Sequence, residues 1–394
     1  MRVAVVGGRL QGVEACYLAK KAGWEVVLVD KEANVPASGL CDEFHCLDVV
    51  KLDNQLAAII KGVDLVLPAF ENWTALALLN DVCFKEGIPC AFDLDAYAIS
   101  SSKLKSDKLF AEIGVPAPTP WPKCSFPVII KPSGLSGSEG VLKAHDMHQY
   151  NLLASRLALD ESSWVVQEFL DGPSYSVEVI GRPGNYKVLQ VTELFMDARY
   201  DCKRVIAPAS LSEADKEQFA QITLKIAQAV KLRGIMDVEV ILHNGELKVL
   251  EIDARLPSQT PTVVYKSAGL NMVDVLGELF VNGCSLQDLK INEKAGAIFE
   301  HIRVSPGKME VLGEHIMGEA GPLFLINDFF GADEAITNYA PGKEYWAATL
   351  IVSGDNRKLA WDKRRRVVER LKNEFAILEY EDLDPVVEDG ERFL

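Results

Sequence analysis

The sequence predicts an α/β protein in which an N-terminal parallel sheet is followed by mixed α+β segments. Residues 2–30 follow the order strand, glycine turn, helix, strand, which is typical of a Rossmann-like unit. Residues 114–122 contain four prolines, which favour an extended linker between domains. Residues 236–253 alternate acidic and apolar side chains on two strand-like runs around Asn244 and Gly245, which indicates a hairpin.

Length and charge limit the functional classes. The 394 residues are enough for two or three domains, each with its own core. Asp and Glu outnumber Lys and Arg by 57 to 41, giving a formal charge of −16. This charge disfavours nucleic acid and anionic membranes as partners. An anionic substrate would have to meet local Lys and Arg side chains.

The cysteines and apolar runs predict a cytosolic protein. Eight cysteines form no C-x-x-C pair and no regular framework, so reduced thiols are favoured over disulfides or zinc. No apolar run approaches ~18 residues, and the N-terminus lacks a small-residue cleavage site. We therefore expect neither a signal peptide nor a membrane span.

The first βαβ unit has three possible uses. We expect strands over 2–6 and 25–29, a glycine turn over 7–12 and a helix over 13–22. Arg9 occupies the position of the middle glycine, so the dinucleotide motif is weak. The turn could simply pack helix on strand. Alternatively, the amides of Gln11 and Gly12 at the helix N-terminus could hold a carboxylate or phosphate.

The next strand ends beside polar residues. Residues 63–67 predict a parallel strand, and ligands bind at the carboxyl ends of such strands. Glu71 and Asn72 are therefore candidate substrate contacts, although Asn72 could equally cap a helix from Trp73. We expect a further strand over 89–93 and a helix over 103–113.

A loop of small residues follows the linker. Strands are expected over 126–131 and 141–143, and the loop over 132–140 is rich in Gly and Ser. Its free backbone N–H groups suit a polyphosphate, with Lys131 at the end of the strand. Walker spacing is absent, and an ordinary flexible turn is the alternative.

Several further elements are expected before the acidic hairpin. Residues 164–170 predict a strand with residues 175–181 as its hairpin partner, placing Ser174, Ser176 and Glu178 on one face. A strand over 187–193 and a polar crossing over 196–204 follow. The helix after Ser212 to Asp215 has an apolar stripe made by Phe219, Ile222, Ile226 and Ala229.

The hairpin is the predicted metal site. Asp237 and Glu239 share one face of the first strand, and Glu251 and Asp253 share one face of the second. Crowded carboxylates need a cation, and oxygen ligands without His or Cys favour magnesium. From these residues alone, a solvated acidic face is an equal alternative.

The remaining chain is predicted to be scaffold. We expect a helix over 272–281, strands over 295–304 and 346–352, and a helix over 362–373. The basic residues 363–366 lie on that helix among many acids. They predict a solvated helix face and not a nucleic-acid site.

The ordered set of strand lysine, glycine loop, QEFL and E-x-D-x-R resembles the ATP-grasp superfamily of carboxylate-amine ligases over residues 1–280. Residues 7–31, 101–120 and 167–181 are further similar to the ligases of pyrrolysine biosynthesis, which join (3R)-3-methyl-D-ornithine to the side-chain amine of L-lysine. The resemblance implies an ATP- and Mg²⁺-dependent enzyme that forms an amide through an acyl phosphate. D-ornithine or its 3-methyl form and L-lysine are the implied partners.

The resemblance implies ATP-grasp architecture in three parts. These are a Rossmann-like domain over 1–98, a central part with a small lid over 99–180, and a C-terminal domain over 181–394 with the metal site and a β-rich tail. ATP would be bound by Lys103, Lys131, Ser133, Ser136, Gly137, Ser138, Gln167, Glu168, Phe169 and Leu170. Glu239, Glu251 and Asp253 would bind magnesium, and Arg255 with Lys131 would stabilise the transferring phosphoryl group.

The implied substrate residues come from several segments. The carboxylate would lie near Arg255, Ser258, Gln259 and Thr260, and the other amino acid near Gln11, Gly12, Glu71 and Asn72. Ser176 lies on the same strand face as Glu178. Glu178, Asp201 and Asp237 are unranked candidates for binding an ammonium group or acting as base. Ser174 stands where the family often has a ribose-binding glutamate, and Asp253 where it usually has asparagine.

Other functional classes stay open at this point. Another ATP-grasp ligase or carboxylase, acting on an amino acid or a purine intermediate, would use the same scaffold. A nicotinamide-dependent dehydrogenase would use the first domain alone and leave the acidic hairpin unexplained. A non-catalytic nucleotide sensor would bind ATP without turnover.

Overall fold

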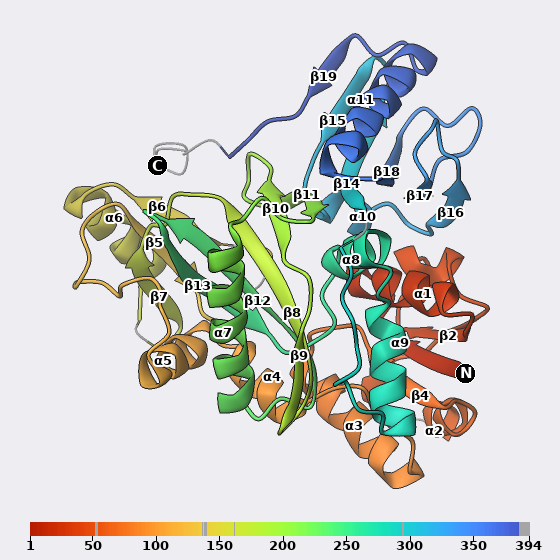
Figure 1. The fold of residues 1–394 in the computed structure, drawn as a ribbon, viewed down its shortest axis with the longest axis horizontal. Helices are drawn as coiled ribbons and strands as arrows, with labels where there is room; N and C mark the ends of the chain where they lie inside the picture. Colours follow the sequence, from red (N-terminus) through yellow and green to blue (C-terminus); the bar gives the residue numbers. More distant parts are fainter. Residues whose placement is uncertain (52–53, 136, 138–139, 161, 294, 386–394) are drawn as a thin grey trace.

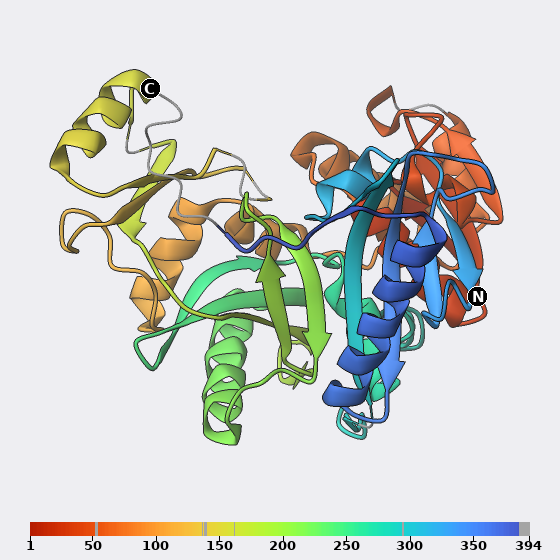
Figure 2. The same cartoon turned by 90° about the horizontal axis from the view of Figure 1, so that it is seen from above.

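The computed structural model describes residues 1–51, 54–135, 137, 140–160, 162–293 and 295–385. Their strands form a four-stranded, a three-stranded and a twelve-stranded sheet (Figure 1). Figure 2 shows the N-terminal elements beside the C-terminal ones, and the small sheet with helix α6 at the opposite end. No described helix combines the length and apolar character needed to cross a membrane.

The N-terminal sheet is entirely parallel, in the order β3-β2-β1-β4. Its elements are β1 (Arg2–Val6), α1 (Leu10–Lys21), β2 (Glu25–Asp30), β3 (Glu43–Cys46), α2 (Asn54–Lys61), β4 (Leu65–Pro68) and α3 (Trp73–Glu86), with short 3₁₀ helices at Pro36–Gly39 and Val49–Lys51. Val3 and Val5 pack towards α1, whereas Ala4 and Val6 pack with Leu79 of α3. Alternating side chains of a parallel strand therefore serve cores on both faces.

The predicted βαβ unit is confirmed with one boundary correction, and one strand predicted further along the chain is absent. Helix α1 begins at Leu10 and not at residue 13, so Gln11 and Gly12 lie in its first turn. The strand expected over 89–93 is wrong, since residue Cys90 makes only an isolated bridge to Val66. Asp93 instead accepts backbone N–H groups as the N-cap of α4 (Leu94–Ser100), and the chain turns there.

The proline-rich segment connects two sheets. Helix α5 (Lys103–Ile113) has the predicted bounds and ends at Gly114, whose φ is +61°. In the segment beyond it, the carbonyl of Pro116 accepts from the N–H of Val249, at 2.8 Å, and the carbonyl of Thr119 accepts from that of Glu168, at 2.9 Å. The extended segment is therefore held against both the large and the small sheet.

The small sheet is antiparallel, in the order β6-β5-β7. It contains β5 (Val128–Pro132), β6 (Leu142–Ala144) and β7 (Trp164–Glu168), with α6 (Met147–Leu157) packed on it. The predicted hairpin between β7 and β8 is wrong, because β8 belongs to the large sheet. Gly172 explains the path: an added Cβ would lie 2.2 Å from the carbonyl oxygen of Leu242, so the chain crosses closely there.

The large sheet runs in the order β13-β12-β8-β10-β11-β14-β18-β17-β16, with β9 on β8, β15 on β14 and β19 on β15. Its strands are β8 (Ser174–Arg182), β9 (Asn185–Val188), β10 (Thr192–Met196), β11 (Cys202–Ala207), β12 (Gly234–His243), β13 (Glu246–Asp253), β14 (Gly296–Ser305), β15 (Lys308–Val311), β16 (Phe324–Asn327), β17 (Glu334–Thr337), β18 (Trp346–Gly354) and β19 (Glu379–Glu381). The single strand expected over 187–193 is therefore two strands, β9 and β10. They pair with different parts of β8.

Helices cover the large sheet and join it to the N-terminal part. They are α7 (Glu213–Ala229), α8 (Thr260–Ala268), α9 (Met272–Gly277) with a π-helical turn at Glu278–Asn282, α10 (His315–Gly318) and α11 (Arg357–Glu374). Ser212 is the N-cap of α7, and its side chain accepts from the N–H of Asp215. Phe219, Ile222 and Ile226 are buried as expected, but Ala229 is exposed.

The expected solvated basic face on α11 is wrong at Arg364. This side chain is 6% exposed and donates to the buried carboxylate of Glu300 on β14. Arg204 and Asp382 complete the same buried ion-pair network. Buried Arg is stable here because several carboxylates surround it, which the local sequence does not reveal.

Candidate active site

The hairpin β12–β13 places its four acids in facing pairs. Asp237 lies opposite Asp253, and Glu239 lies opposite Glu251. The neighbouring strand β8 adds Glu178 opposite Asp237, with Ser176 opposite Glu239. Because strand side chains alternate, these residues point to one face of the sheet. The predicted acidic hairpin is confirmed. Its pairing with β8, which adds Glu178 and Ser176 to the same face, was not predicted.

This carboxylate cluster is partly buried, and the pKa values of three of its acids are raised. Burial, followed by repulsion from neighbouring acids, raises the pKa of Glu239 to about 8. Burial also raises the pKa of Asp253 to about 7 and that of Asp237 well above its usual range. Asp237 Oδ1 and Asp253 Oδ1 are buried without a hydrogen-bond partner among the described residues. The alternative of an exposed acidic face is therefore wrong.

The chemistry of the cluster fits a hard divalent cation. It offers several carboxylate oxygens, two of them unpartnered, and no His or Cys ligand. Among the described residues, Lys103, Lys131 and Arg255 lie beside the cluster, and Lys103 Nζ is 3.4 Å from Glu251 Oε2. The four hairpin acids and Glu178 outnumber these three cations. Magnesium bound through Glu239, Glu251 and Asp253 would supply the missing positive charge.

Arg255 links the acidic hairpin to the N-terminal sheet. Its Nη2 lies 2.8 Å from Asp253 Oδ2 and 2.8 Å from Glu71 Oε1. Burial opposes the charge, but the surrounding carboxylates raise the pKa of Arg255 above its usual range. Glu71 also accepts from Gln11 Nε2 at 3.1 Å. The guanidinium is therefore a permanent cation between two parts of the chain.

The lysine and loop predicted to bind phosphates lie next to the acids. Lys131 is 4% exposed at the end of β5, and burial lowers its pKa while Glu251 and Asp107 oppose the change. Ser133 Oγ lies 3.2 Å from Ser102 Oγ, and the carbonyl of Ser133 accepts from the N–H of Lys103. Gly137 lines the cavity described below. Ser136 and Ser138 lie outside the described residues.

In the QEFL segment, expected to bind adenine, the side chain of Glu168 is engaged in contacts within the protein. Gln167 is 3% exposed, and Leu170 is buried. The carboxylate of Glu168 accepts from Lys248 Nζ at 2.7 Å and from the N–H of Thr119 at 3.0 Å. Its side chain thus fixes the linker to β13, and only its backbone is available for a nucleotide. Lys143 Nζ lies 3.4 Å from the centre of the Phe169 ring.

A cavity of about 840 Å³ lies between the N-terminal sheet and the segments that carry Asp201, Arg255 and Glu314. Its lining includes Gln11, Glu71, Asn72, Asp201, Arg255, Ser258, Glu314 and His315. The Asn72 side chain accepts from the N–H of Ala75, so its alternative role as helix cap is confirmed. Gly12 is buried, and an added Cβ would lie 2.1 Å from the carbonyl oxygen of Gly7, so close packing accounts for this glycine.

The residues predicted to bind the substrate carboxylate, at the start of α8, donate hydrogen bonds to Glu314 and Glu178. Ser258 Oγ and Gln259 Nε2 donate to Glu314 Oε2, at 2.7 and 2.9 Å. Thr260 Oγ1 donates to Glu178, whose pKa burial raises to about 7. Gln259 has a φ of +71°, an uncommon conformation that is often kept at functional sites.

Sequence reasoning missed Glu314 and His315. Glu314 directly precedes α10, His315 is its first residue, and both line the cavity. No motif or periodic pattern marks them. Their position depends on packing of this segment against the turn that contains Asp201, which is distant in the sequence. His315 Nδ1 lies 2.5 Å from Asp201 Oδ2.

Comparison with known proteins decides the family. A family model of the ATP-grasp domain matches residues 100–259. The 3-methyl-D-ornithine–L-lysine ligase of Methanosarcina barkeri is 36% identical over 385 residues, covering 95% of this chain and 98% of that protein. The chain belongs to the ATP-grasp superfamily. The predicted family and its ATP-grasp fold are thereby confirmed.

Solved ATP-grasp structures share this fold at low sequence identity. The biotin carboxylase domain of Hydrogenobacter thermophilus 2-oxoglutarate carboxylase, solved with MgADP and bicarbonate, has a TM-score of 0.71 at 17% identity and covers 93% of this chain and 89% of its own. An L-amino acid ligase from Bacillus licheniformis has a TM-score of 0.68 at 16% identity and covers 94% and 97%. The present chain is an ATP-grasp ligase that forms carbon–nitrogen bonds. The dehydrogenase alternative is therefore wrong.

Proposed function

We propose that this ATP-grasp ligase joins the carboxylate of (3R)-3-methyl-D-ornithine to the side-chain amine of L-lysine. The main support is the 36% identity to a 3-methyl-D-ornithine–L-lysine ligase over nearly the full length of both proteins. The acidic cavity adds independent support, because Glu71, Asp201 and Glu314 in its lining suit substrates that carry ammonium groups. Glu178 and Asp237 face each other on the neighbouring strands β8 and β12. The predicted cytosolic location and the division at 1–98, 99–180 and 181–394 remain part of this proposal.

The proposed ATP site lies between the small sheet and the hairpin. Lys103 and Lys131 would contact phosphates, with Ser133 and Gly137 in the covering loop. Gln167 and the backbone of residues 168–170 would bind adenine. The site has the charge that a nucleotide needs, since two lysines lie beside acids able to hold magnesium.

The charge arrangement suits activation of a carboxylate. Magnesium held by Glu239, Glu251 and Asp253 would neutralise charge on the phosphates of ATP. Lys131 interacts with Glu251 and Arg255 pairs with Asp253, and these two buried cations would stabilise the transferring phosphoryl group. The substrate carboxylate would lie near Arg255, Ser258, Gln259 and Thr260. Transfer of the γ-phosphoryl group makes an acyl phosphate, which an amine can attack.

The deciding assay supplies ATP, magnesium, L-lysine and either D-ornithine or 3-methyl-D-ornithine. Phosphate release and an amide product, detected by mass spectrometry, should require both amino acids. Product formed without ATP consumption would contradict the proposal. Replacing each amino acid by bicarbonate or by a purine intermediate tests the carboxylase and purine-ligase alternatives in the same assay.

Two substitutions test the residue assignments. Lys131→Ala and Glu251→Ala should each reduce ADP release driven by the two amino acids by at least about 10²-fold, because each removes charge stabilisation that acts on the transferring phosphoryl group. Glu246→Ala, at an exposed position in the hairpin turn, is the matched control and should keep full turnover. Normal turnover of a folded Lys131→Ala protein would remove that residue from the mechanism.

A further inference from the structure

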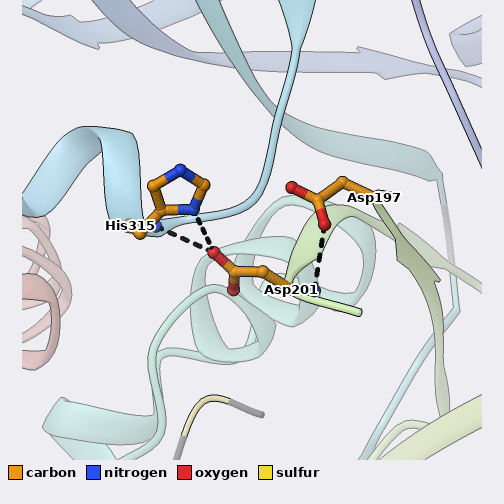
Figure 3. Close-up of side chains that lie close together, drawn as sticks. All are labelled: Asp197, Asp201 and His315. Carbon is orange, nitrogen blue, oxygen red and sulfur yellow. Dashed lines mark hydrogen bonds and ion pairs between the residues drawn. The ribbon is translucent and has the colours of Figure 1, made fainter. Parts of the chain in front are cut away.

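Two aspartates and a histidine meet at the edge of the substrate cavity (Figure 3). Asp197 and Asp201 stand in the turn between β10 and β11, and His315 begins α10. One ligand atom from each lies within 4.8 Å of the others. Asp201 and His315 line the cavity that also contains Arg255 and Glu71.

The hydrogen bonds of Asp197 account for its position. Its Oδ1 accepts from the N–H groups of Arg199 and Asp201, at 2.7 and 3.1 Å, and its Oδ2 accepts from that of Gly313 at 2.9 Å. Both oxygens therefore hold backbone segments together. Asp197 fixes the turn with Asp201 against the segment with His315, which favours a positioning role over metal coordination.

The contacts of Asp201 fix the orientation and tautomer of His315. Asp201 Oδ2 accepts from the backbone N–H of His315 at 3.1 Å and from Nδ1 at 2.5 Å. With the proton on Nδ1, the neutral imidazole has its lone pair on Nε2. Figure 3 shows this second nitrogen turned away from both aspartates. The side chain is 40% exposed, and His315 lines the cavity.

The proposed reaction needs a proton acceptor at this place. The side-chain amine of lysine has an ordinary pKa of ~10.4 and enters mainly as an ammonium ion, which has no free electron pair. Asp–His pairs provide oriented bases, since the carboxylate stabilises the imidazolium that forms. Glu239 and Asp253 are proposed magnesium ligands, and Asp237 lies between Glu178 and Asp253 within the hairpin cluster. They are therefore less suited to this task.

We propose that His315 is the base that deprotonates the amine substrate, with Asp201 as its positioning residue. This assignment rests on the ligase function proposed above. An ammonium N–H bond breaks, the proton goes to Nε2, and the electron pair stays on nitrogen. That nitrogen bonds to the acyl carbon, and the carbon–oxygen bond to phosphate breaks. The departing phosphate takes the second proton, and the imidazolium returns the first to solvent.

The charges around His315 come from several elements. Asp197 and Asp201 face it from the β10–β11 turn, and Glu314 precedes it in the chain. Arg255 lies in the lining of the same cavity. His301 of β14 also acts on it electrostatically, but burial lowers the pKa of His301 to about 3 and keeps that ring neutral. The acids favour an ammonium ion near Nε2.

The test compares two nucleophiles for the same acyl phosphate. Hydroxylamine is uncharged near neutral pH and needs no base, whereas L-lysine does. His315→Asn should slow amide formation by about 10²-fold or more and change hydroxamate formation from D-ornithine and ATP less than about twofold. Asp201→Asn should also slow amide formation more than hydroxamate formation, but by a smaller factor than His315→Asn. His148→Asn, on the exposed part of α6, is the control and should leave both rates unchanged.

Raising the pH supplies a second readout. Between about pH 7 and about pH 9 the free lysine amine increases roughly tenfold per unit, so the gap between His315→Asn and the wild type should narrow. An equal loss of amide and hydroxamate, or a gap that does not change with pH, would overturn the role of His315. A wild-type protein that makes neither product with ATP consumption would instead overturn the proposed function. If His315→Asn does not fold, Asp201→Asn decides between the same outcomes.

Discussion

At the residue scale, Glu14 illustrates how the fold buries acids away from the reaction centre. It lies in α1, 1% exposed, and accepts from the backbone N–H of Thr262 in the first turn of α8. Burial raises the pKa of Glu14 to about 7, although the hydrogen bond from Thr262 opposes that change. The carboxyl group is therefore protonated in the folded protein at pH values where the unfolded chain has lost the proton.

This linkage predicts a pH-dependent gain from Glu14→Gln. The unfolded carboxyl has an ordinary pKa of ~4.3, so the folded wild type loses stability as pH rises from there to about 7. Gln has no proton to lose and still accepts from Thr262. The variant should therefore be the more stable protein above pH 7, by up to about 3 kcal/mol, with no difference below about pH 4. Denaturant unfolding at several pH values measures this.

Glu25→Gln, at an exposed position in β2, is the control for that series. It should show no comparable change with pH. A constant difference between Glu14→Gln and the wild type from pH 4 to pH 8 would show that Glu14 has the same proton affinity in both states.

At the scale of elements, the hairpin turn determines the register of the acid pairs. Asn244 and Gly245 have φ values of +52° and +82°, as the tight turn between β12 and β13 requires. An added Cβ at Gly245 meets nothing within 4 Å, so only the backbone conformation opposes a side chain there. Gly245→Ala should thus cost about 1 kcal/mol and shift the denaturation midpoint. Asn244→Gly, the reverse change at the neighbouring position, should be tolerated.

Local patterns explain which elements sequence reasoning could find. The helix over 103–113 has the predicted bounds because Gly114 ends it, and the acidic hairpin was found from alternation and its turn. The pairing of β7 with β5, and not with β8, depends on strands distant in sequence. No local pattern encodes that choice. The same holds for Glu300, which turns Arg364 from a surface residue into a buried one.

The residues of the candidate site also fall into those that sequence patterns identify and those that they do not. Lys131 and the four hairpin acids were identifiable because they belong to ordered motifs on strands. Glu314 and His315 were not, since a loop without pattern brings them to the cavity only after β14 and β15 have packed. Motifs thus indicated the proposed nucleotide side, while the amino-acid side depends on tertiary packing.

At the scale of the whole molecule, α1 holds the N-terminal sheet against the C-terminal part (Figure 2). Glu334 on β17 is the centre of this interface. It accepts from Tyr17 and Lys21 of α1 and lies 3.1 Å from Lys266 of α8. The amino-acid cavity is lined by residues from both sides of this interface. Lys131 and Gln167 of the proposed nucleotide site belong to the small sheet instead. Changes at Glu334 should therefore affect the binding of the amino acids more than the binding of ATP.

Glu334→Ala removes a carboxylate that neutralises two lysines and accepts from Tyr17. The loss should destabilise the protein by about 2–3 kcal/mol and lower the apparent Tm by several degrees. The KM for each amino acid should rise a few-fold with the KM for ATP unchanged, because only the amino-acid cavity has walls on both sides of the interface. Glu310→Ala is the matched control, since Glu310 pairs with Arg303 within the C-terminal strands. Equal increases in all three KM values would show that the interface does not act on the cavity separately from the proposed nucleotide site.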